Sequence, residues 1–349
     1  MKEANKASCT HSGAALQAKD FALVDLHLHL DGSLSLASVR ELAAMENISL
    51  PERDEELLPL FRVGPDCRDL NEYLEKFAFT TSLMQTKETL SKSVSNLMEE
   101  LKEQGLLYAE IRFAPQLHLQ KGLTQKEVIE AAIEGLHRSD FKAGLILCAM
   151  RGEDNFQANL ETVRLAADYL GKGVVAVDLA GAEALFPTKN FKELFSLAAE
   201  LGIPYTIHAG EADGAESIRS ALSFGTKRLG HGIRSHEDPV LMKELAEKHI
   251  TLELCPSSNL HTNIFPSIEV YPLRRLLDAG MALTLNTDNM AVSGVTLQSE
   301  YQQVMDAHCL TREELVQLAQ NAAKASFADA ETKKWLLGEL ENRFFAMAT

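Results

Sequence analysis

The sequence predicts an α/β protein, a (β/α)8 TIM barrel with a helical insertion after the first strand and extra helices at the C-terminal end. The chain has 349 residues, a length that one barrel domain can occupy. Short runs rich in Val, Ile and Leu alternate with longer segments of helical period, a pattern that is typical of a parallel sheet. Eight such runs occur, and eight strands close a barrel of this kind.

The eight predicted strands are spread from one end of the chain to the other. Each is a short apolar run that is bounded by turn residues or by a segment of helical period. In chain order they span 22–30, 106–114, 143–151, 174–181, 203–210, 228–233, 251–256 and 281–288.

The first connection is unusually long. About 75 residues separate the first two predicted strands, far more than a simple βα unit needs. The segments 36–47, 70–84 and 88–105 have helical spacing, so we expect a small helical insertion over the face where the strands end. After the last strand, 310–326 and 329–346 predict closing helices. The first of these begins with a capping-box pattern, Thr-Arg-Glu-Glu.

The composition is that of a globular protein, with 46% hydrophobic and 24% charged residues. The formal net charge of -16, without any Lys/Arg-rich run, makes nucleic acids and anionic membranes poor partners. The five cysteines form no C-x-x-C pair, which argues against a disulfide framework and a thiolate metal site. We expect a flexible tail over 1–20, a single domain over 21–349, and a cytoplasmic protein, because residues 1–20 lack the apolar segment of a secretory signal.

Metal-capable side chains stand at the ends of four predicted strands. His27 and His29 are two residues apart, so both imidazoles face the same side of the first strand. Alone, such a pair is more often structural than metal-binding. His208, His231 and Asp288 end strands five, six and eight, however, and these ends converge at the mouth of a barrel. Imidazoles with one carboxylate suit zinc, although cobalt, iron and manganese accept similar ligands.

Two glutamates complete this constellation. Glu211 follows His208 by three residues and is placed to donate a proton beside the ion. Alternatively, Glu211 is an acidic residue in the first turn of the next helix, where its charge interacts favourably with the helix dipole. Glu253 lies inside strand seven and needs a partner if it is buried. We expect that partner to be His231 on the neighbouring strand. Barrel hydrolases with two metal ions usually bridge them with a modified lysine at the end of strand four. Here that end reads VDLAGAE and has no lysine, which favours one metal ion.

Seven motifs, in order, resemble the adenosine deaminase family over nearly the whole chain from about residue 22. They are LHLHLDGS, YAEIRFAP, DLAGAE, HAGE, LGHGI, ELCPSSN and LNTDN. The resemblance implies hydrolysis of adenosine and 2'-deoxyadenosine to inosine, or 2'-deoxyinosine, and ammonia in purine salvage. It also implies one Zn²⁺ per chain, bound by His27, His29, His208 and Asp288.

The same resemblance assigns roles to residues around the base. His231 is expected to orient and deprotonate the attacking water, and Glu211 to protonate N1 of the purine. His29 also contacts the substrate, and the backbone N–H of Gly181 meets N3.

The resemblance also assigns residues to the ribose and to N7. Asp31 matches the residue that binds the ribose 5'-hydroxyl, and Phe77 belongs to an apolar lid over the ribose. Asn289 departs from the commonest pattern, in which a second aspartate follows the metal-binding one. Its amide can donate to N7 without needing a proton, so we expect this contact to survive while the fine purine preference stays open.

Three alternatives remain beside this interpretation. An adenine deaminase or an adenosine-monophosphate-type deaminase has the same superfamily features, but Asp31 weighs against both. Arg112 and Arg151 are placed to hold a phosphate, yet salt bridging is the favoured role. A scaffold that has lost its chemistry is disfavoured because the ligand set is complete. The expected partner is a purine nucleoside, and the expected assembly is a monomer or a weak homo-oligomer.

Overall fold

All eight predicted strands are present in the computed structural model of the chain, which describes residues 17, 18, 21 and 23–346. Nearly all of their side chains are buried. The apolar runs extend past the strands because residues that follow several strand ends are buried as well. The strands are β1 (Val24–His29), β2 (Tyr108–Phe113), β3 (Lys142–Met150), β4 (Val174–Ala180), β5 (Ile207–Ala209), β6 (Arg228–His231), β7 (Thr251–Leu254) and β8 (Ala282–Leu285).

The strands form a closed ring in sequence order. Parallel ladders join β1, β2, β3 and β4, in that order, into one sheet. They join β5, β6, β7 and β8 in the same way into a second sheet. A bridge between Val177 and Tyr205 joins the two sheets at one seam. At the other seam the N–H of Asp288 donates to the carbonyl of His27, and the N–H of His29 donates to the carbonyl of Asp288, both at 2.7 Å. The predicted barrel is therefore confirmed, and its closure brings the first strand beside the last.

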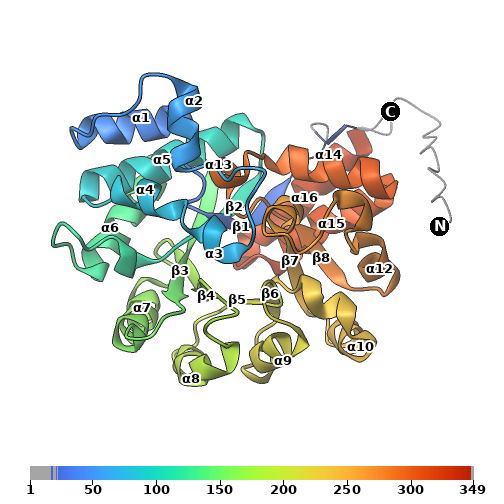
Figure 1. The fold of residues 1–349 in the computed structure, drawn as a ribbon. Helices are drawn as coiled ribbons and strands as arrows, with labels where there is room; N and C mark the ends of the chain where they lie inside the picture. Colours follow the sequence, from blue (N-terminus) through green and yellow to red (C-terminus); the bar gives the residue numbers. More distant parts are fainter. Residues whose placement is uncertain (1–16, 19–20, 22, 347–349) are drawn as a thin grey trace.

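Helices surround this ring (Figure 1). The longer helices are α1 (Leu36–Met45), α5 (Lys87–Glu103), α6 (Gln125–Leu136), α7 (Phe156–Tyr169), α8 (Lys192–Glu200), α9 (Ala215–Ser223), α10 (Pro239–Glu247), α14 (Leu297–His308), α15 (Arg312–Ala325) and α16 (Ala330–Ala346). The shorter α-helices are α2 (Asp54–Leu57), α3 (Leu70–Leu74), α4 (Phe77–Ser82), α11 (Pro256–His261), α12 (Leu273–Asp278) and α13 (Met290–Ser293). The 3-10 helices are η2 (Leu58–Leu60), η3 (Pro115–Leu117), η4 (Thr188–Phe191), η5 (Ile233–Glu237) and η6 (Ile268–Val270).

The predicted insertion after β1 consists of α1 to α4, and α3 and α4 reach the mouth of the barrel. The Asp69 carboxylate begins α3 by accepting the N–H groups of Asn71 and Glu72 at 2.9 and 3.1 Å. The segment 88–105 was expected in the same insertion, but it forms α5, which packs beside α6 in the outer ring. Helical period alone does not distinguish a barrel helix from an inserted one.

The C-terminal helices α15 and α16 pack against β1 and β2. Small and aliphatic side chains of α15 and α16, among them Ala322 and Leu336, pack against Val24 and Tyr108. The predicted capping box is confirmed, because Thr311 accepts the N–H of Glu314 at 3.2 Å and the Glu314 carboxylate accepts the N–H of Thr311 at 2.8 Å.

The predicted tail, residues 1–20, lies outside the described residues except at Gln17 and Ala18. Ala18 is buried, and its N–H donates to Oε1 of Gln302 at 3.0 Å. The tail and the single domain over 21–349 therefore stay predictions.

The spacing of the cysteines argued against a disulfide framework, and this expectation is wrong at one position. Cys67, Cys148 and Cys255 are free thiols, but Cys309 is disulfide-bonded. Disulfide formation requires that two sulfur atoms meet in space, which the spacing of cysteines along a chain does not reveal.

Candidate active site

The five metal-capable side chains predicted at strand ends meet at one point in the barrel mouth. His27 and His29 come from β1, His208 from β5 and His231 from the end of β6, while Asp288 follows β8. The ring centroid of His27 lies 4.5 Å from that of His208 and 4.9 Å from that of His231. The convergence that the barrel argument required is therefore present.

Four of these side chains have the geometry of a metal site. Nε2 of His29 lies 3.3 Å from Nε2 of His208, and Oδ1 of Asp288 lies 3.4 and 3.5 Å from Nε2 of His27 and His29. Four ligands of one zinc ion would stand about 3.3–3.6 Å apart at the corners of a tetrahedron. Within the described chain, Nε2 of His27 and Oδ1 of Asp288 are also buried without a hydrogen-bond partner. This set fits one divalent cation.

The outer nitrogens of two of these imidazoles face buried carboxylates. Nδ1 of His27 is 2.8 Å from Oε2 of Glu253, and Nδ1 of His208 is 2.8 Å from Oδ2 of Asp178. Such partners hold the proton on Nδ1 and leave Nε2 free to bind a metal. Asp178 was missed in the sequence, although a single carboxylate in the apolar strand β4 is the same signal that identified Glu253.

The partner expected for Glu253 is corrected by the structure. Glu253 pairs in register with Gly230 on β6, one residue before His231, so the side chain of His231 does not face it. A Cβ atom on Gly230 would lie 3.1 Å from Cε1 of His27. The absence of a side chain at Gly230 therefore leaves room for the ring of His27, which bonds Glu253 instead.

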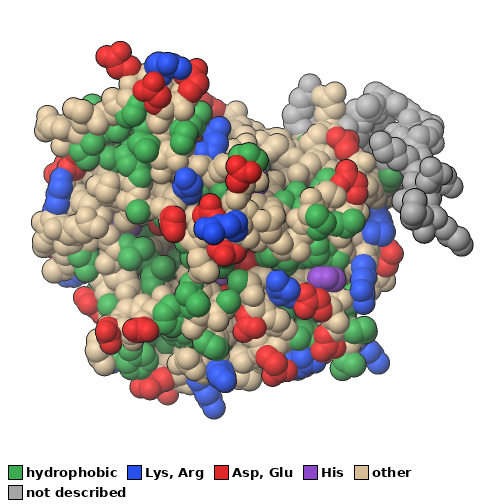
Figure 2. Space-filling view, viewed as in Figure 1, with side chains coloured by type: hydrophobic (Ala, Val, Ile, Leu, Met, Phe, Trp, Pro, Cys, Tyr) green, Lys and Arg blue, Asp and Glu red, His purple; other side chains and the backbone are tan. Residues whose placement is uncertain are grey.

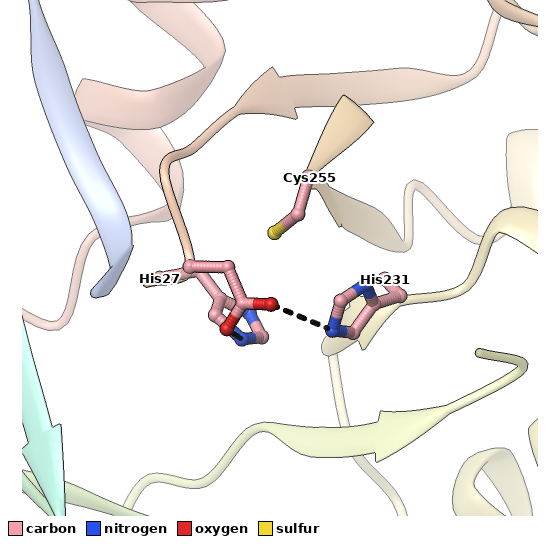
Figure 3. Close-up of side chains that lie close together, drawn as sticks. His27, His231 and Cys255 are labelled. Carbon is pink, nitrogen blue, oxygen red and sulfur yellow. Dashed lines mark ion pairs between the residues drawn. The ribbon is translucent and has the colours of Figure 1, made fainter. Parts of the chain in front are cut away.

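A second group of potential ligands overlaps the first. His27, His231 and Cys255 converge from three strand ends, together with Asp288 (Figure 3). Burial, followed by the nearby charge of Asp288, raises the pKa of the Cys255 thiol well above its usual value. In the group with His29 and His208, the ligand atoms are spaced as the corners of a zinc tetrahedron, so this group is the better metal site.

His231 has a strained backbone and a defined tautomer. Its φ of 58° and that of Asp288, 59°, lie in the left-handed region, where strain is often found at functional sites. The hydroxyl of Tyr271 donates to Oδ1 of Asn259 at 3.1 Å, so the Asn259 amide presents its N–H to Nδ1 of His231, also at 3.1 Å. The proton of neutral His231 is then on Nε2, which lies 3.6 Å from Oε1 of Glu211. This geometry favours orienting a water over deprotonating it.

The loop that carries Glu211 is held by a carboxylate that the sequence reasoning missed. Glu183 accepts the backbone N–H groups of Gly210, Glu211, Ala212 and Asp213 at 2.7 to 3.0 Å. It lies in the DLAGAE motif and is fully buried. Four consecutive N–H groups form an anion-binding turn, so this contact fixes the path of the loop.

The electrostatic surroundings of Glu211 favour its protonated form. Burial, followed by the negative charges of Asp288 and Glu183, raises the pKa of Glu211 well above its usual value. The alternative role as a first-turn acid does not apply, because α9 begins at Ala215 after Gly214. Glu211 is therefore an acid that faces the site.

A cavity of about 180 Å³ opens beside these groups. Its wall includes His29, His208, His231, Asp288 and Glu211. It also includes the other residues expected to contact a nucleoside, which are Asp31, Phe77, Gly181 and Asn289. Gly181 has a φ of 104°, and a Cβ atom on Gly32 would come within 1.9 Å of Oδ1 of Asn289, so both positions require glycine. Burial raises the pKa of Asp31 to about 6.

The two arginines considered for phosphate binding have other contacts. Arg112 is fully buried and forms ion pairs with Asp178 and Glu253, each at 2.8 Å, which confirms salt bridging. Arg151 instead donates to the carbonyls of Phe186 and His208, so salt bridging is the wrong description there. A carbonyl-binding role leaves no pattern in the sequence.

The fold and the site together define a class of protein: a barrel hydrolase of the amidohydrolase type, with candidate metal ligands at the carboxyl ends of its strands. Residues 22–343 match the family model described as adenosine deaminase. The chain belongs to the adenosine deaminase family.

Individual relatives agree with this assignment. An adenosine deaminase from Haemophilus ducreyi is 48% identical over 333 residues, covering 93% of this chain and 97% of the relative. The structure of an adenine deaminase from Arthrobacter aurescens has a TM-score of 0.84 at 27% identity, covering 92% of this chain and 98% of that one. An Arabidopsis N6-mAMP deaminase has a TM-score of 0.83 at 25% identity, covering 93% and 99%. The chain is a hydrolase that deaminates adenosine, and its family implies a divalent metal.

Proposed function

We propose that the chain hydrolyses adenosine and 2'-deoxyadenosine to inosine and 2'-deoxyinosine with one zinc ion, bound by His27, His29, His208 and Asp288. The observation that carries the proposal is the packing of these four ligand atoms within 4.8 Å of one another. Burial lowers the pKa of His29 and of His208, which keeps both imidazoles neutral and able to bind a cation.

Zinc, when bound, lowers the pKa of a coordinated water to about 7 and so supplies hydroxide at neutral pH. His231 orients the attacking oxygen by donating a hydrogen bond from Nε2. The hydrogen bond from the Asn259 amide to Nδ1 keeps the imidazole directed into the site.

Glu211 makes the purine reactive. C6 of an aromatic ring is a poor electrophile, and a proton on N1 breaks the conjugation of the ring as the oxygen adds to C6. The raised pKa of Glu211 keeps its carboxyl group protonated for this transfer. The proton of the added hydroxyl group then passes to the 6-amino group, and the C6–N bond breaks with loss of ammonia. C6 becomes a carbonyl carbon, and the nucleoside product is inosine or 2'-deoxyinosine.

The cavity walls position the nucleoside. The N–H of Gly181 binds N3 and the amide of Asn289 donates to N7. Asp31 binds the 5'-hydroxyl, while Phe77 from α4 covers the ribose and His29 contacts the substrate. The presence of all five residues in the cavity wall supports these roles.

The charge of Asp31 favours a nucleoside over a nucleotide as the substrate. With a pKa of about 6, Asp31 is ionised at neutral pH and repels a 5'-phosphate. Arg112 and Arg151 do not compensate for this repulsion, because buried protein groups already occupy their guanidinium groups. Adenine lacks the 5'-hydroxyl that Asp31 binds, so it is also disfavoured.

The proposed surroundings are cytoplasmic, and the proposed assembly is a monomer or a weak homo-oligomer. None of the helices in the described part of the chain is long and apolar enough to cross a membrane. Figure 2 shows acidic and basic side chains mixed over the visible face, without a continuous basic patch. Such a surface supports a small-molecule partner and no nucleic acid or membrane.

A substrate panel with metal analysis tests the proposal. The purified protein is assayed at equal concentrations of adenosine, 2'-deoxyadenosine, adenine and adenosine monophosphate, by the absorbance change on loss of the 6-amino group. We expect both nucleosides to react at least tenfold faster than the other two, with one zinc per chain. Faster turnover of adenine or of the monophosphate would refute the assignment of Asp31.

A further inference from the structure

Arg112 lies in the barrel interior, between the two sides of the proposed metal site. Its side chain comes from β2 and is fully buried. Nη1 donates to Oδ2 of Asp178 at 2.8 Å, and Nη2 donates to Oε2 of Glu253 at 2.8 Å. Nη2 also donates to the carbonyl of Leu26 at 2.5 Å. A single guanidinium thus joins carboxylates from β4 and β7.

The oxygen atoms that Arg112 contacts are the same ones that face the metal-binding imidazoles. Oδ2 of Asp178 lies 2.8 Å from Nδ1 of His208, and Oε2 of Glu253 lies 2.8 Å from Nδ1 of His27. The chain of contacts therefore runs from one imidazole, through Arg112, to the other. It links β1 to β5, on opposite sides of the ring.

Arginine suits this position because its planar fork has donors in fixed directions. The separation of the two carboxylates therefore follows from the geometry of one rigid group. A carboxylate that is held in place in turn fixes the orientation of the imidazole that it faces.

We propose that Arg112 is a positioning residue for the metal centre, which sets the spacing and orientation of His27 and His208 through their carboxylate partners. This inference rests on the proposed metal site. Arg112 does not line the cavity, and the side chains that connect it with the two imidazoles are Asp178 and Glu253.

Arg228 provides a matched control in the same buried network. Its Nε donates to Oε1 of Glu253 at 2.6 Å, and its Nη1 donates to Oε2 of Glu110 at 2.7 Å. It therefore touches the oxygen of Glu253 that faces away from His27. A lysine at Arg228 disturbs a buried ion pair of the same kind without breaking the link between the two imidazoles.

The experiment compares wild type, Arg112→Lys and Arg228→Lys. Each protein is stripped with a chelator, and its affinity for Zn²⁺ alone is measured by competition with a zinc indicator. Unfolding of the metal-free proteins is followed by circular dichroism. We expect Arg112→Lys to weaken zinc binding about 10- to 100-fold, since one ammonium group cannot bridge both carboxylates. Arg228→Lys should lower the melting temperature of the metal-free protein but change zinc affinity less than about threefold.

The outcomes separate this inference from the proposed function. Wild type that binds no zinc overturns the metal site itself. Wild type that binds zinc, with Arg112→Lys binding it equally well, overturns only the role of Arg112. Equal losses in both variants would also overturn it, because they would show a general effect of buried charge.

If the metal-free Arg112→Lys protein does not fold, Asp178→Asn tests the same link. This variant keeps the size of the side chain but removes the charge that joins Arg112 to His208. We expect a loss of zinc affinity of the same order, and unchanged affinity contradicts the proposal.

Discussion

At the scale of single residues, a substitution of Glu211 tests proton transfer separately from metal binding. Because an amide cannot supply the proton to N1, Glu211→Gln should retain one metal ion per chain and lose at least 100-fold in kcat. His208→Ala, which removes a ligand, should lose both metal and turnover. Metal content and initial rates measured on the same preparations check these expectations. Glu211→Gln with wild-type kcat would remove the proposed acid from the mechanism.

The sequence was sufficient to predict the residues that define the cluster, but not all of their partners. His27, His29, His208 and Asp288 stand at strand ends, where barrel geometry forces convergence. The partner of Glu253 depended on register, which a single sequence does not reveal. Other supporting groups that the sequence reasoning missed are Asp178, Glu183 and Asn259.

At the scale of elements, the loop between β5 and α9 controls the position of Glu211. Glu183→Gln replaces an oxygen that accepts backbone N–H groups with an amide nitrogen that repels them. We expect kcat to fall about 10- to 100-fold with a smaller change in KM, because a displaced acid affects the chemical step most. Steady-state kinetics check this, with the exposed Glu216→Gln as the control that should match wild type.

The same variant should change the pH dependence. The negative charge of Glu183 contributes to the raised pKa of Glu211, which is active when protonated. Loss of the Glu183 charge lowers the pKa of Glu211. As the pH rises, activity should therefore disappear at a lower pH in Glu183→Gln than in wild type. A pH profile that keeps its alkaline limb would contradict the electrostatic part of this account.

Elements differ in how well their sequence patterns predict them. The strands were recognisable because buried parallel strands are continuous apolar runs. Helix α5 was recognised as a helix, yet its place in the outer ring depends on packing against α6. Periodicity reports which face of a helix is apolar, but not which neighbour covers that face.

At the scale of the whole molecule, Glu300 links stability to pH. It is fully buried, accepts from the backbone N–H of Ser257 at 3.2 Å and from Gln303 at 2.7 Å, and burial raises its pKa to about 7. The folded state thus holds a proton that the unfolded state releases above its pKa of 4.5. Its contribution to stability should fall by roughly 3 kcal/mol from pH 4.5 to about 7 and stay constant above.

Glu300→Gln should remove that part of the pH dependence. Denaturant unfolding of metal-free protein at pH 5 and pH 8 gives the difference for each variant. The exposed Glu313→Gln should behave as wild type. An equal loss of stability between the two pH values in Glu300→Gln and wild type would show that Glu300 does not titrate in this range.

Metal removal and reconstitution test the central claim most directly. Chelator-treated protein receives zinc in small steps, while bound metal and adenosine turnover are measured on the same samples. We predict that activity is absent without metal, rises in proportion to bound zinc and is complete at one ion per chain. Full turnover by metal-free protein, or a rise that continues to two ions per chain, would contradict a single metal centre formed by β1, β5 and β8.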